Sequence, residues 1–301
     1  MVYDDDDTRS WWSKDTVVAV TGSNKGLGYE IVRGLAKQGL TTVLTARDPA
    51  RGLTALQTLQ AEGLDSVHFH QLDVTDTDSV KKLAAWLQKE FGGFDILINN
   101  AAVQKFSQVY EDAQETLETN YFGAKTVTKE LFPLLRSASP AGARIVMVSS
   151  QNGLLRRFEN NYVKSKLRVD AQQLNEDIID SVATKYLEDV KTGRANEEGW
   201  APNGYQYSES KLFLNAYVRV LAGSLRNQPK DCPIFVNSIC PGPIDTDMAA
   251  GYLKKMGLDR TQVRGLVSAE EVSKAVISLA LLPRDGYPTG KFFTDGHEIA
   301  F

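Results

Sequence analysis

The segment that most constrains the fold is a short strand followed at once by a glycine-rich loop and an amphipathic helix. Residues 16–20, TVVAV, are mostly β-branched and apolar, and the loop at 21–28 has the sequence TGSNKGLG. Apolar residues then recur at helical spacing, as at Ile31, Val32 and Leu35. The N-terminus of a helix that follows such a loop can bind a phosphate through its unpaired N–H groups. A tight turn is the structural alternative. The candidate cofactor contacts in this loop are Gly22, Asn24, Lys25, Gly26, Leu27 and Gly28.

Further strand-like segments alternate with helical ones along the chain. The spacing predicts strands at 41–48, 67–72, 94–102, 143–150, 233–239 and 291–294, and helices at about 50–62, 76–91, 115–135 and 268–282. Such alternation is typical of a doubly wound, parallel sheet of the Rossmann type. Asn120 falls inside one of these helices, where asparagine competes for backbone hydrogen bonds. We therefore expect that helix to be bent or strained.

The end of the second strand bears on the choice of cofactor. In dinucleotide folds an acidic residue there binds the ribose of NAD, whereas an arginine accommodates the 2′-phosphate of NADP. Arg47 occupies that position, and Lys25 adds a second cation nearby. Asp48 precedes Pro49 and is interpreted as a helix cap. These charges favour NADP(H); two solvated surface cations are the alternative.

The third and fourth strands end in further candidate contacts. Ligands bind beyond the carboxyl ends of parallel strands. Asp73 and Val74 are therefore placed to meet an adenine ring. Asn100 and Ala101 end the fourth strand, where we expect the amide to brace the sheet and to shape the nicotinamide side.

Length and composition exclude several classes of protein. The chain has 301 residues, of which 42% are hydrophobic and 24% charged, as expected of a soluble domain with a sizeable core. We expect a flexible acidic tail at 1–14 and a single domain at 15–301. A net charge of −4 gives no reason to expect nucleic acid or membrane partners. Two cysteines without a disulfide framework fit a reducing compartment, the cytoplasm, and three histidines suggest no metal site.

Two Tyr-x-x-x-Lys pairs compete as candidate acid–base groups. On a helix both members of such a pair share one face, and a lysine cation stabilises a neighbouring phenolate. The pairs are Tyr162 with Lys166 and Tyr207 with Lys211. After Tyr207 a single helical pattern leads into the strand at 233–239, as a short crossover requires. After Tyr162 two polar helical stretches intervene. Topology therefore favours Tyr207.

Together these residues resemble the short-chain dehydrogenase/reductase family, in its carbonyl-reductase-like branch, over nearly the whole chain from residue 16. The motifs are the loop at 21–28, Asp73, Asn99–Ala101, Asn120, Ser149–Ser150, the Tyr-x-x-x-Lys pair, Pro241–Gly242 and Thr246. The sequence departs from the family at Ala102, where glycine is usual, and at 204–206, where small residues are usual. The second departure puts the substrate-side shape in doubt.

The resemblance implies a role for each candidate catalytic residue. Tyr207 would protonate a carbonyl oxygen as hydride arrives from NADPH, and Ser150 would hydrogen-bond the same oxygen. Lys211 would lower the pKa of the tyrosine and bind the ribose, and Asn120 would hold a water. Ser149 would only cap the strand. Tyr207, Lys211, Pro241, Gly242 and Thr246 would also contact the cofactor.

The resemblance further implies an NADPH-dependent reductase of a hydrophobic ketone or aldehyde, working reversibly as an alcohol dehydrogenase. The insertion at about 151–203 would cover the face that related enzymes use to dimerise, which predicts a monomer. A flap at about 244–265 would cover the substrate, with Met248, Tyr252, Leu253 and Met256 as lining residues or ordinary helix packing. The alternatives are reduction of an enone C=C bond and an NADP(H)-binding protein without turnover.

Overall fold

The computed structural model describes residues 10–105, 107, 109–136, 141–170, 173–200, 206–228, 233–255, 257–258 and 265–301, except the side chains of Asp247, Tyr252 and Lys255. The acidic run at 4–7, the family departure at 204–205 and the proposed lining residue Met256 therefore lie outside the described residues. The predicted lining role of the Tyr252 side chain also lies outside the described part of the structure.

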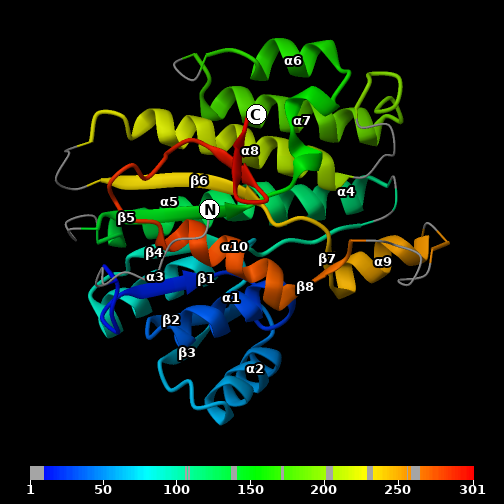
Figure 1. The fold of residues 1–301 in the computed structure, drawn as a ribbon. Coiled ribbons are helices and arrows are strands. Elements are labelled where there is room, and N and C mark those ends of the chain that lie inside the picture. Colours follow the sequence, from blue (N-terminus) through cyan, green and yellow to red (C-terminus); the bar gives the residue numbers. More distant parts are fainter. Residues whose placement is uncertain are drawn as a thin grey trace.

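An eight-stranded sheet forms the centre of the described structure, in the order β10-β9-β6-β5-β4-β1-β2-β3 (Figure 1). The strands are β1 (Val17–Val20), β2 (Thr41–Ala46), β3 (Val67–Gln71), β4 (Ile96–Asn99), β5 (Ala143–Val148), β6 (Ile234–Cys240), β9 (Phe292–Thr294) and β10 (His297–Ile299). All neighbouring strands from β3 to β9 pair in parallel, and β10 pairs antiparallel with β9. The predicted doubly wound sheet is confirmed, and the antiparallel edge strand is an addition.

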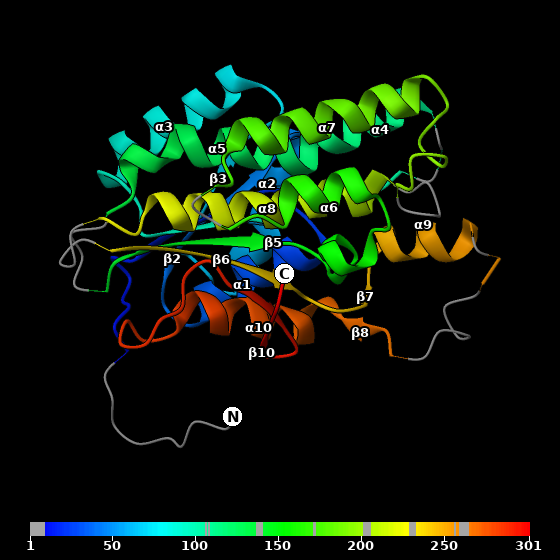
Figure 2. The same ribbon diagram turned by 90° about the horizontal axis from the view of Figure 1, so that it is seen from above.

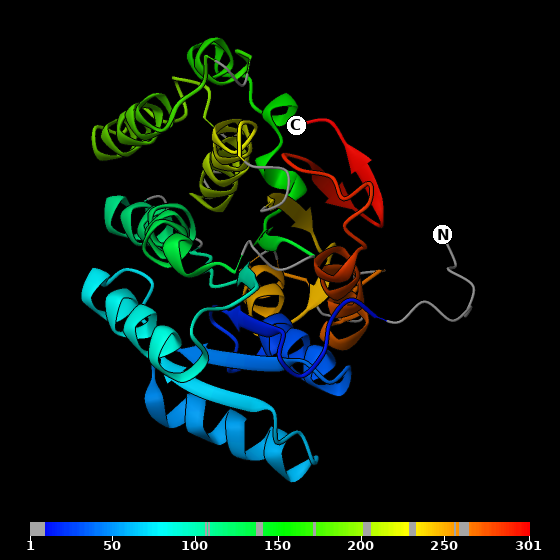
Figure 3. The ribbon, with the colours of Figure 1, turned by 90° about the vertical axis from the view of Figure 1, so that its left-hand side faces the viewer.

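Side-chain alternation along the strands divides the core between the two faces of this sheet. In β1, Val17 and Ala19 belong to one apolar cluster, whereas Val18 and Val20 belong to another. Helices cover both faces, as Figure 3 shows. The helices α1 (Gly26–Lys37) and α10 (Ala269–Leu281) pack together on one side. The other side carries α3 (Thr77–Phe91), α5 (Ala124–Leu131) and α8 (Gln206–Ser224).

The predicted helix cap at Asp48 is present, and α10 begins with a second polar cap residue. Asp48 caps α2 (Pro49–Ala61) by accepting a hydrogen bond from the Arg51 N–H. Ser268 caps α10 in the same way, accepting from Glu271 N–H. Both fit the preference for short polar side chains at this position.

The helix that contains Asn120 is longer and less regular than predicted. It begins at Tyr110 rather than at 115, as α4 (Tyr110–Leu117). A π-helical segment, Glu118–Gly123, separates α4 from α5, and a 3₁₀ turn, Phe132–Leu134, follows α5. The expected distortion is confirmed, since a π-helical turn is a rare interruption of an α-helix.

The insertion contributes α6 (Asn161–Leu167) and α7 (Glu176–Lys191), which lie outside α8 and α4 (Figure 2). Two 3₁₀ turns, Gln151–Gly153 and Leu155–Arg157, precede them. Apolar residues of α7 join the same core cluster as α8. Asp180 of α7 accepts hydrogen bonds from the Tyr121 hydroxyl at 2.7 Å and from Lys125 Nζ at 2.5 Å. The insertion is therefore packed and ion-paired onto the main body.

The N-terminal segment is anchored at Trp11. The Trp11 indole lies 3.7 Å from the guanidinium of Arg144, which is fully buried in β5, and donates to the Leu281 carbonyl at 2.9 Å. Tyr287 lies on Arg144 as well, at 4.9 Å. Trp11 thus packs the N-terminal segment onto the sheet.

The region of the expected flap contains a small separate sheet, β7 (Ile244–Asp245) with β8 (Val267–Ser268), and the helix α9 (Asp247–Lys255). Leu253 is 5% exposed, and Met248 is partly exposed. No helix in the described part of the chain has both the length and the apolar character needed to cross a membrane.

Candidate active site

Tyr207 and Lys211 lie one turn apart near the start of α8. The Lys211 ammonium is 5.5 Å from the centre of the Tyr207 ring and donates to the Val148 carbonyl at 2.8 Å. Val148 is the last residue of β5, so this bond fixes the lysine at the carboxyl end of the sheet. Lys211 is only 2% exposed, whereas Tyr207 remains partly accessible.

Burial shifts both ionisable groups toward their neutral forms. Burial lowers the pKa of Lys211 to about 8, although nearby Cys240 acts in the opposite direction. Burial also raises the pKa of Tyr207, as does Cys240, whereas a hydrogen bond from Ser150 lowers it. Loss of hydration therefore dominates the pKa of Tyr207, and the expected lowering by Lys211 stays a prediction. The phenol is protonated at neutral pH and can act as an acid.

The two serines that follow β5 have different surroundings. Ser150 lies close enough to Tyr207 to lower the pKa of its phenol, and Ser150 Oγ accepts from the Asn152 N–H at 3.1 Å. The Ser149 hydroxyl is buried and has no hydrogen-bond partner, so it does not cap the strand. The structure thus brings Ser150, and not Ser149, to the tyrosine.

Asn120 holds the π-helical segment against two other parts of the site. Its Oδ1 accepts from Val103 N–H at 2.8 Å, and its Nδ2 donates to the Val103 carbonyl at 2.9 Å. Nδ2 also donates to Ser210 Oγ at 3.0 Å. Asn120 therefore fastens the loop after β4 to α8, and both of its amide hydrogens are used within the protein.

The glycine loop has the close approaches that exclude side chains. Gly22 and Gly26 have positive φ angles of 61° and 59°, a region that strongly favours glycine. A Cβ on Gly28 would lie 2.5 Å from Asn100 Nδ2. That nitrogen donates to the carbonyls of Thr21 and Gly22 at 3.0 Å each, so the Asn100 amide braces the start of the glycine loop, where the expectation was the sheet. Ala101 lies against Gly22: its Cα is 2.8 Å from where a Cβ on Gly22 would stand.

The N-terminus of α1 fits a phosphate. Its cap residue, Lys25, makes no side-chain capping hydrogen bond, and the first turn contains no acidic residue. The N–H groups there and the positive end of the helix dipole favour an anion. Leu27 is 7% exposed and anchors this turn in the core.

Arg51 is a candidate that the sequence analysis missed. Together with Asn24 and Lys25 it lines an open cavity of about 490 Å³ between the glycine loop and α2. Arg47 is exposed just after β2, and Arg51 follows four residues later in the first turn of α2. A basic residue in the first turn of the helix after β2 was the available signal, but its position depends on where that helix begins.

The remaining cofactor candidates also lie at the carboxyl edge of the sheet. Thr246 Cγ2 is 3.7 Å from where a Gly26 Cβ would stand, so the segment after β6 crosses the glycine loop. Pro241 and Gly242 follow β6 directly, and Gly242 has a φ of 82°. Asp73 accepts from the Thr75 N–H and hydroxyl. Val74 is buried against the π-helical segment, which makes it part of the core as well.

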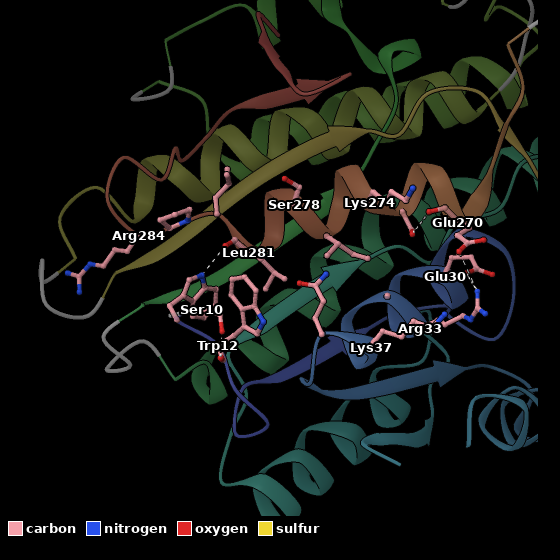
Figure 4. Close-up of a pocket in the computed structure, with 17 residues that line it drawn as sticks. Ser10, Trp12, Glu30, Arg33, Lys37, Glu270, Lys274, Ser278, Leu281 and Arg284 are labelled. Atoms are coloured by element: carbon pink, nitrogen blue, oxygen red, sulfur yellow. Dashed lines mark hydrogen bonds and ion pairs between the residues drawn. The ribbon is translucent and has the colours of Figure 1, made fainter. Parts of the chain in front are cut away.

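Another cavity, of about 880 Å³, lies between α1, α10 and the N-terminal segment (Figure 4). Trp12, Lys37, Lys274 and Leu281 are among its lining residues. It contains none of the site residues described above. Within the described residues no cluster of three or more His, Cys, Asp or Glu side chains could hold a metal ion.

Comparison with known proteins agrees with this geometry. Residues 16–175 match the family model described as short chain dehydrogenase, and residues 190–294 match a model described as enoyl-(acyl carrier protein) reductase. The chain is 38% identical to (+)-neomenthol dehydrogenase of Arabidopsis thaliana, over 91% of this chain and 94% of that protein. It is also 38% identical to carbonyl reductase [NADPH] 1 of Mus musculus, over 94% and 97%.

A solved structure has the same fold. The structure of salutaridine reductase from Papaver somniferum matches with a TM-score of 0.81 and 35% identity, covering 93% of this chain and 99% of that one. The identity, coverage and structural agreement are sufficient to assign the family. The chain belongs to the short-chain dehydrogenase/reductase family of oxidoreductases.

Proposed function

We propose that the protein is an NADPH-dependent carbonyl reductase that converts a hydrophobic ketone or aldehyde to an alcohol, reversibly. The observation that carries this proposal is the convergence of a protonated phenol, a hydroxyl and a buried lysine beyond β5, at Tyr207, Ser150 and Lys211. Relatives whose names state NADPH-dependent carbonyl reduction support it.

The residues of the chain have complementary tasks in this proposal. Bound NADPH would supply the hydride. Tyr207 donates its phenolic proton to the carbonyl oxygen, where negative charge develops. Ser150 holds that oxygen in line, as a donor fixed in advance of the reaction. Lys211, while charged, stabilises the phenolate that remains and is placed to bind a ribose hydroxyl.

Asn120 does not contact the substrate carbonyl directly in this proposal. Both of its amide hydrogens are donated within the protein, to Val103 and Ser210. It could therefore contact a water beside Lys211 only as an acceptor. We propose that its main task is to hold the helix α8 in place relative to the loop after β4.

The preference for NADPH is proposed from the cations beside the glycine loop. Lys25 and Arg51 line the same cavity, and Arg47 lies at the end of β2, where a 2′-phosphate is accommodated. Arg51→Ala should weaken NADPH binding about tenfold, the effect of losing one charge-assisted contact, and leave NADH binding unchanged. Equal losses for both cofactors would contradict this assignment.

We propose a cytoplasmic monomer with a substrate-covering segment at 244–265. The helix α7 covers α4 and α8, and its Asp180 and Glu176 pair with Lys125. An occupied helix face is not available for a partner subunit. Light scattering coupled to size-exclusion chromatography should give the mass of one chain, and a dimer would contradict the proposal.

The decisive assay is NADPH oxidation in the presence of a panel of hydrophobic ketones and aldehydes. Turnover that disappears in Tyr207→Phe, with NADPH binding retained, would support the proposal. Binding of NADPH without turnover of any substrate in the panel would instead indicate an NADP(H)-binding protein without catalysis.

Reduction of a C=C bond is the second candidate, because residues 190–294 match a model named for an enoyl reductase. Tyr207 favours the carbonyl, since proton donation to oxygen needs an acid at that position. An α,β-unsaturated ketone separates the two reactions. Carbonyl reduction gives an allylic alcohol, whereas C=C reduction gives a saturated ketone.

A further inference from the structure

Gln206 lies directly before Tyr207 in the first turn of α8. Its side chain is 1% exposed, and its Nε2 donates to the Ser107 carbonyl at 2.6 Å. The other amide atom, Oε1, is buried without a hydrogen-bond partner. A buried, unpaired acceptor costs about 1–3 kcal/mol. A glutamine that makes one bond and leaves one atom unpaired contributes little to stability, which points to a different role.

The contact at Ser107 connects three elements. Ser107 Oγ donates to Asp112 Oδ2, in the first turn of α4, at 2.5 Å and accepts from Val109 N–H at 3.3 Å. Gln206 therefore links the start of α8 to the start of α4 through Ser107. Without the hydrogen bond from Gln206, the described contacts of Ser107 attach Ser107 only to α4 and to its own loop.

A second attachment lies one turn further along α8. Ser210, four residues after Gln206, accepts a hydrogen bond from Asn120, which in turn holds Val103. Residues four apart share one face of a helix. One face of α8 thus holds the segment after β4 at two points, Val103 and Ser107.

This segment leads from the cofactor loop to α4. At its start Ala101 lies against Gly22, and at Ser107 it meets the residue that precedes Tyr207. Substrates in such sheets lie beyond the carboxyl ends of the strands. A bulky carbonyl compound at Tyr207 must therefore rest against this segment.

We infer that Gln206 is a positioning residue that sets the substrate-facing wall formed after β4, and so determines which carbonyl compounds fit beside Tyr207. The inference rests on the proposed function for its kinetic consequence, but the positioning itself is independent of turnover. Gln206 touches neither the reacting atoms nor the cofactor loop.

The chain contains a matched control just beyond the other end of α8. Gln228 follows α8 and makes two hydrogen bonds with the backbone of Ile234. It donates to the Ile234 carbonyl at 2.9 Å and accepts from the Ile234 N–H at 2.8 Å. Both glutamines thus hold backbone to the region of α8, but Gln228 lies at the amino end of β6, away from the site. Gln228→Met removes two hydrogen bonds, and Gln206→Met removes one together with the unpaired oxygen.

The two variants should therefore show opposite behaviour. Gln206→Met should raise the KM for a bulky ketone about fivefold, the value of one hydrogen bond, while kcat for a small aldehyde and NADPH affinity stay within twofold. Its thermal midpoint should barely change. Gln228→Met should lower the thermal midpoint and leave every KM unchanged.

Hydrogen exchange of the intact protein tests the positioning without any substrate. Backbone amides at 102–105 should exchange faster in Gln206→Met, and at the wild-type rate in Gln228→Met. Unchanged exchange at 102–105, or an equal KM increase for small and bulky substrates, would overturn the inference. An inactive wild-type protein would refute the proposed function alone, because the exchange rates still decide the role of Gln206.

Discussion

The two Tyr-x-x-x-Lys pairs are almost identical as local geometry and very different as sites. The lysine nitrogen lies 5.5 Å from the tyrosine ring in α8 and 5.7 Å in α6. Lys211, however, is 2% exposed and bonded to the end of β5, whereas Lys166 is exposed. Four-residue spacing on a helix produces the contact in both cases. Burial at the carboxyl end of the sheet is what distinguishes the pair in α8.

The pair in α6 has a structural use. Tyr162 packs against the core of the insertion, and the ammonium groups of Lys166 and Lys185 both lie over its ring. Such contacts contribute about 0.5–1 kcal/mol each at exposed sites. The same residue types therefore stabilise one helix and, in the proposed function, carry out proton transfer on another.

Replacement of the two tyrosines should show the largest difference. Tyr207→Phe removes the proposed acid, whose contribution is about 10²–10⁴-fold, so kcat/KM should fall by about 10³ or more. Tyr162→Phe keeps the ring and should leave kcat/KM within twofold. Steady-state kinetics on both variants checks this, and comparable losses would assign no special role to α8.

Replacement of the two lysines should give the next largest difference. Lys211→Met should reduce kcat/KM by about 10²–10³, because the cation that stabilises the phenolate is lost. Reduction by the wild type should also slow as pH rises through about 8, where the Lys211 ammonium deprotonates. Lys166→Met should behave as wild type at every pH. A pH–rate profile shared by Lys211→Met and wild type would assign the decline to another group.

The pH dependence of stability should follow the same contrast. Burial lowers the pKa of Lys211 from 10.5 to about 8, so below pH 8 the folded protein bears the full cost of a buried charge. Between these values the unfolded chain holds a proton that the folded one has released, and stability rises with pH. The gain is about 3 kcal/mol for such a shift.

Urea denaturation at pH 7 and near pH 10.5 measures this effect. The unfolding free energy that Lys211→Met gains over wild type should be larger at pH 7 than near pH 10.5, by up to about 3 kcal/mol. The corresponding difference for Lys166→Met should not depend on pH. A pH-independent difference for Lys211→Met would mean that Lys211 has the same pKa in the folded and the unfolded chain.

The serines should show the smallest effect. Ser150→Ala removes the hydroxyl beside Tyr207 and should lower kcat/KM by about 10–10², the value of one hydrogen bond to a charged group. Ser149→Ala removes a buried hydroxyl without a partner, so activity should remain and stability should be unchanged or slightly higher. Measured kcat/KM and unfolding free energies distinguish the two, and a larger loss in Ser149→Ala would reverse the assignment.

The features set by local sequence were predictable. Strand–glycine loop–helix order predicted the sheet, and the chain order after Tyr207 chose the pair in α8. Features that depend on distant contacts were not. Arg51 lines the same cavity as Lys25 only because of how α2 packs, and the pKa of Tyr207 depends on burial that no spacing encodes. The hydrogen bond between Gln206 and Ser107 joins residues 99 positions apart.

The π-helical segment also fixes the rotational phase between α4 and α5. Each residue of an α-helix turns the chain by about 100°, so one residue fewer in Glu118–Gly123 would rotate α5 by that angle. Lys125 would then swing away from Asp180, and Thr128 away from the Asn99 amide that it now accepts from at 3.0 Å. Single-residue deletions here should therefore uncouple the insertion from the sheet, although the helix itself could continue without a break.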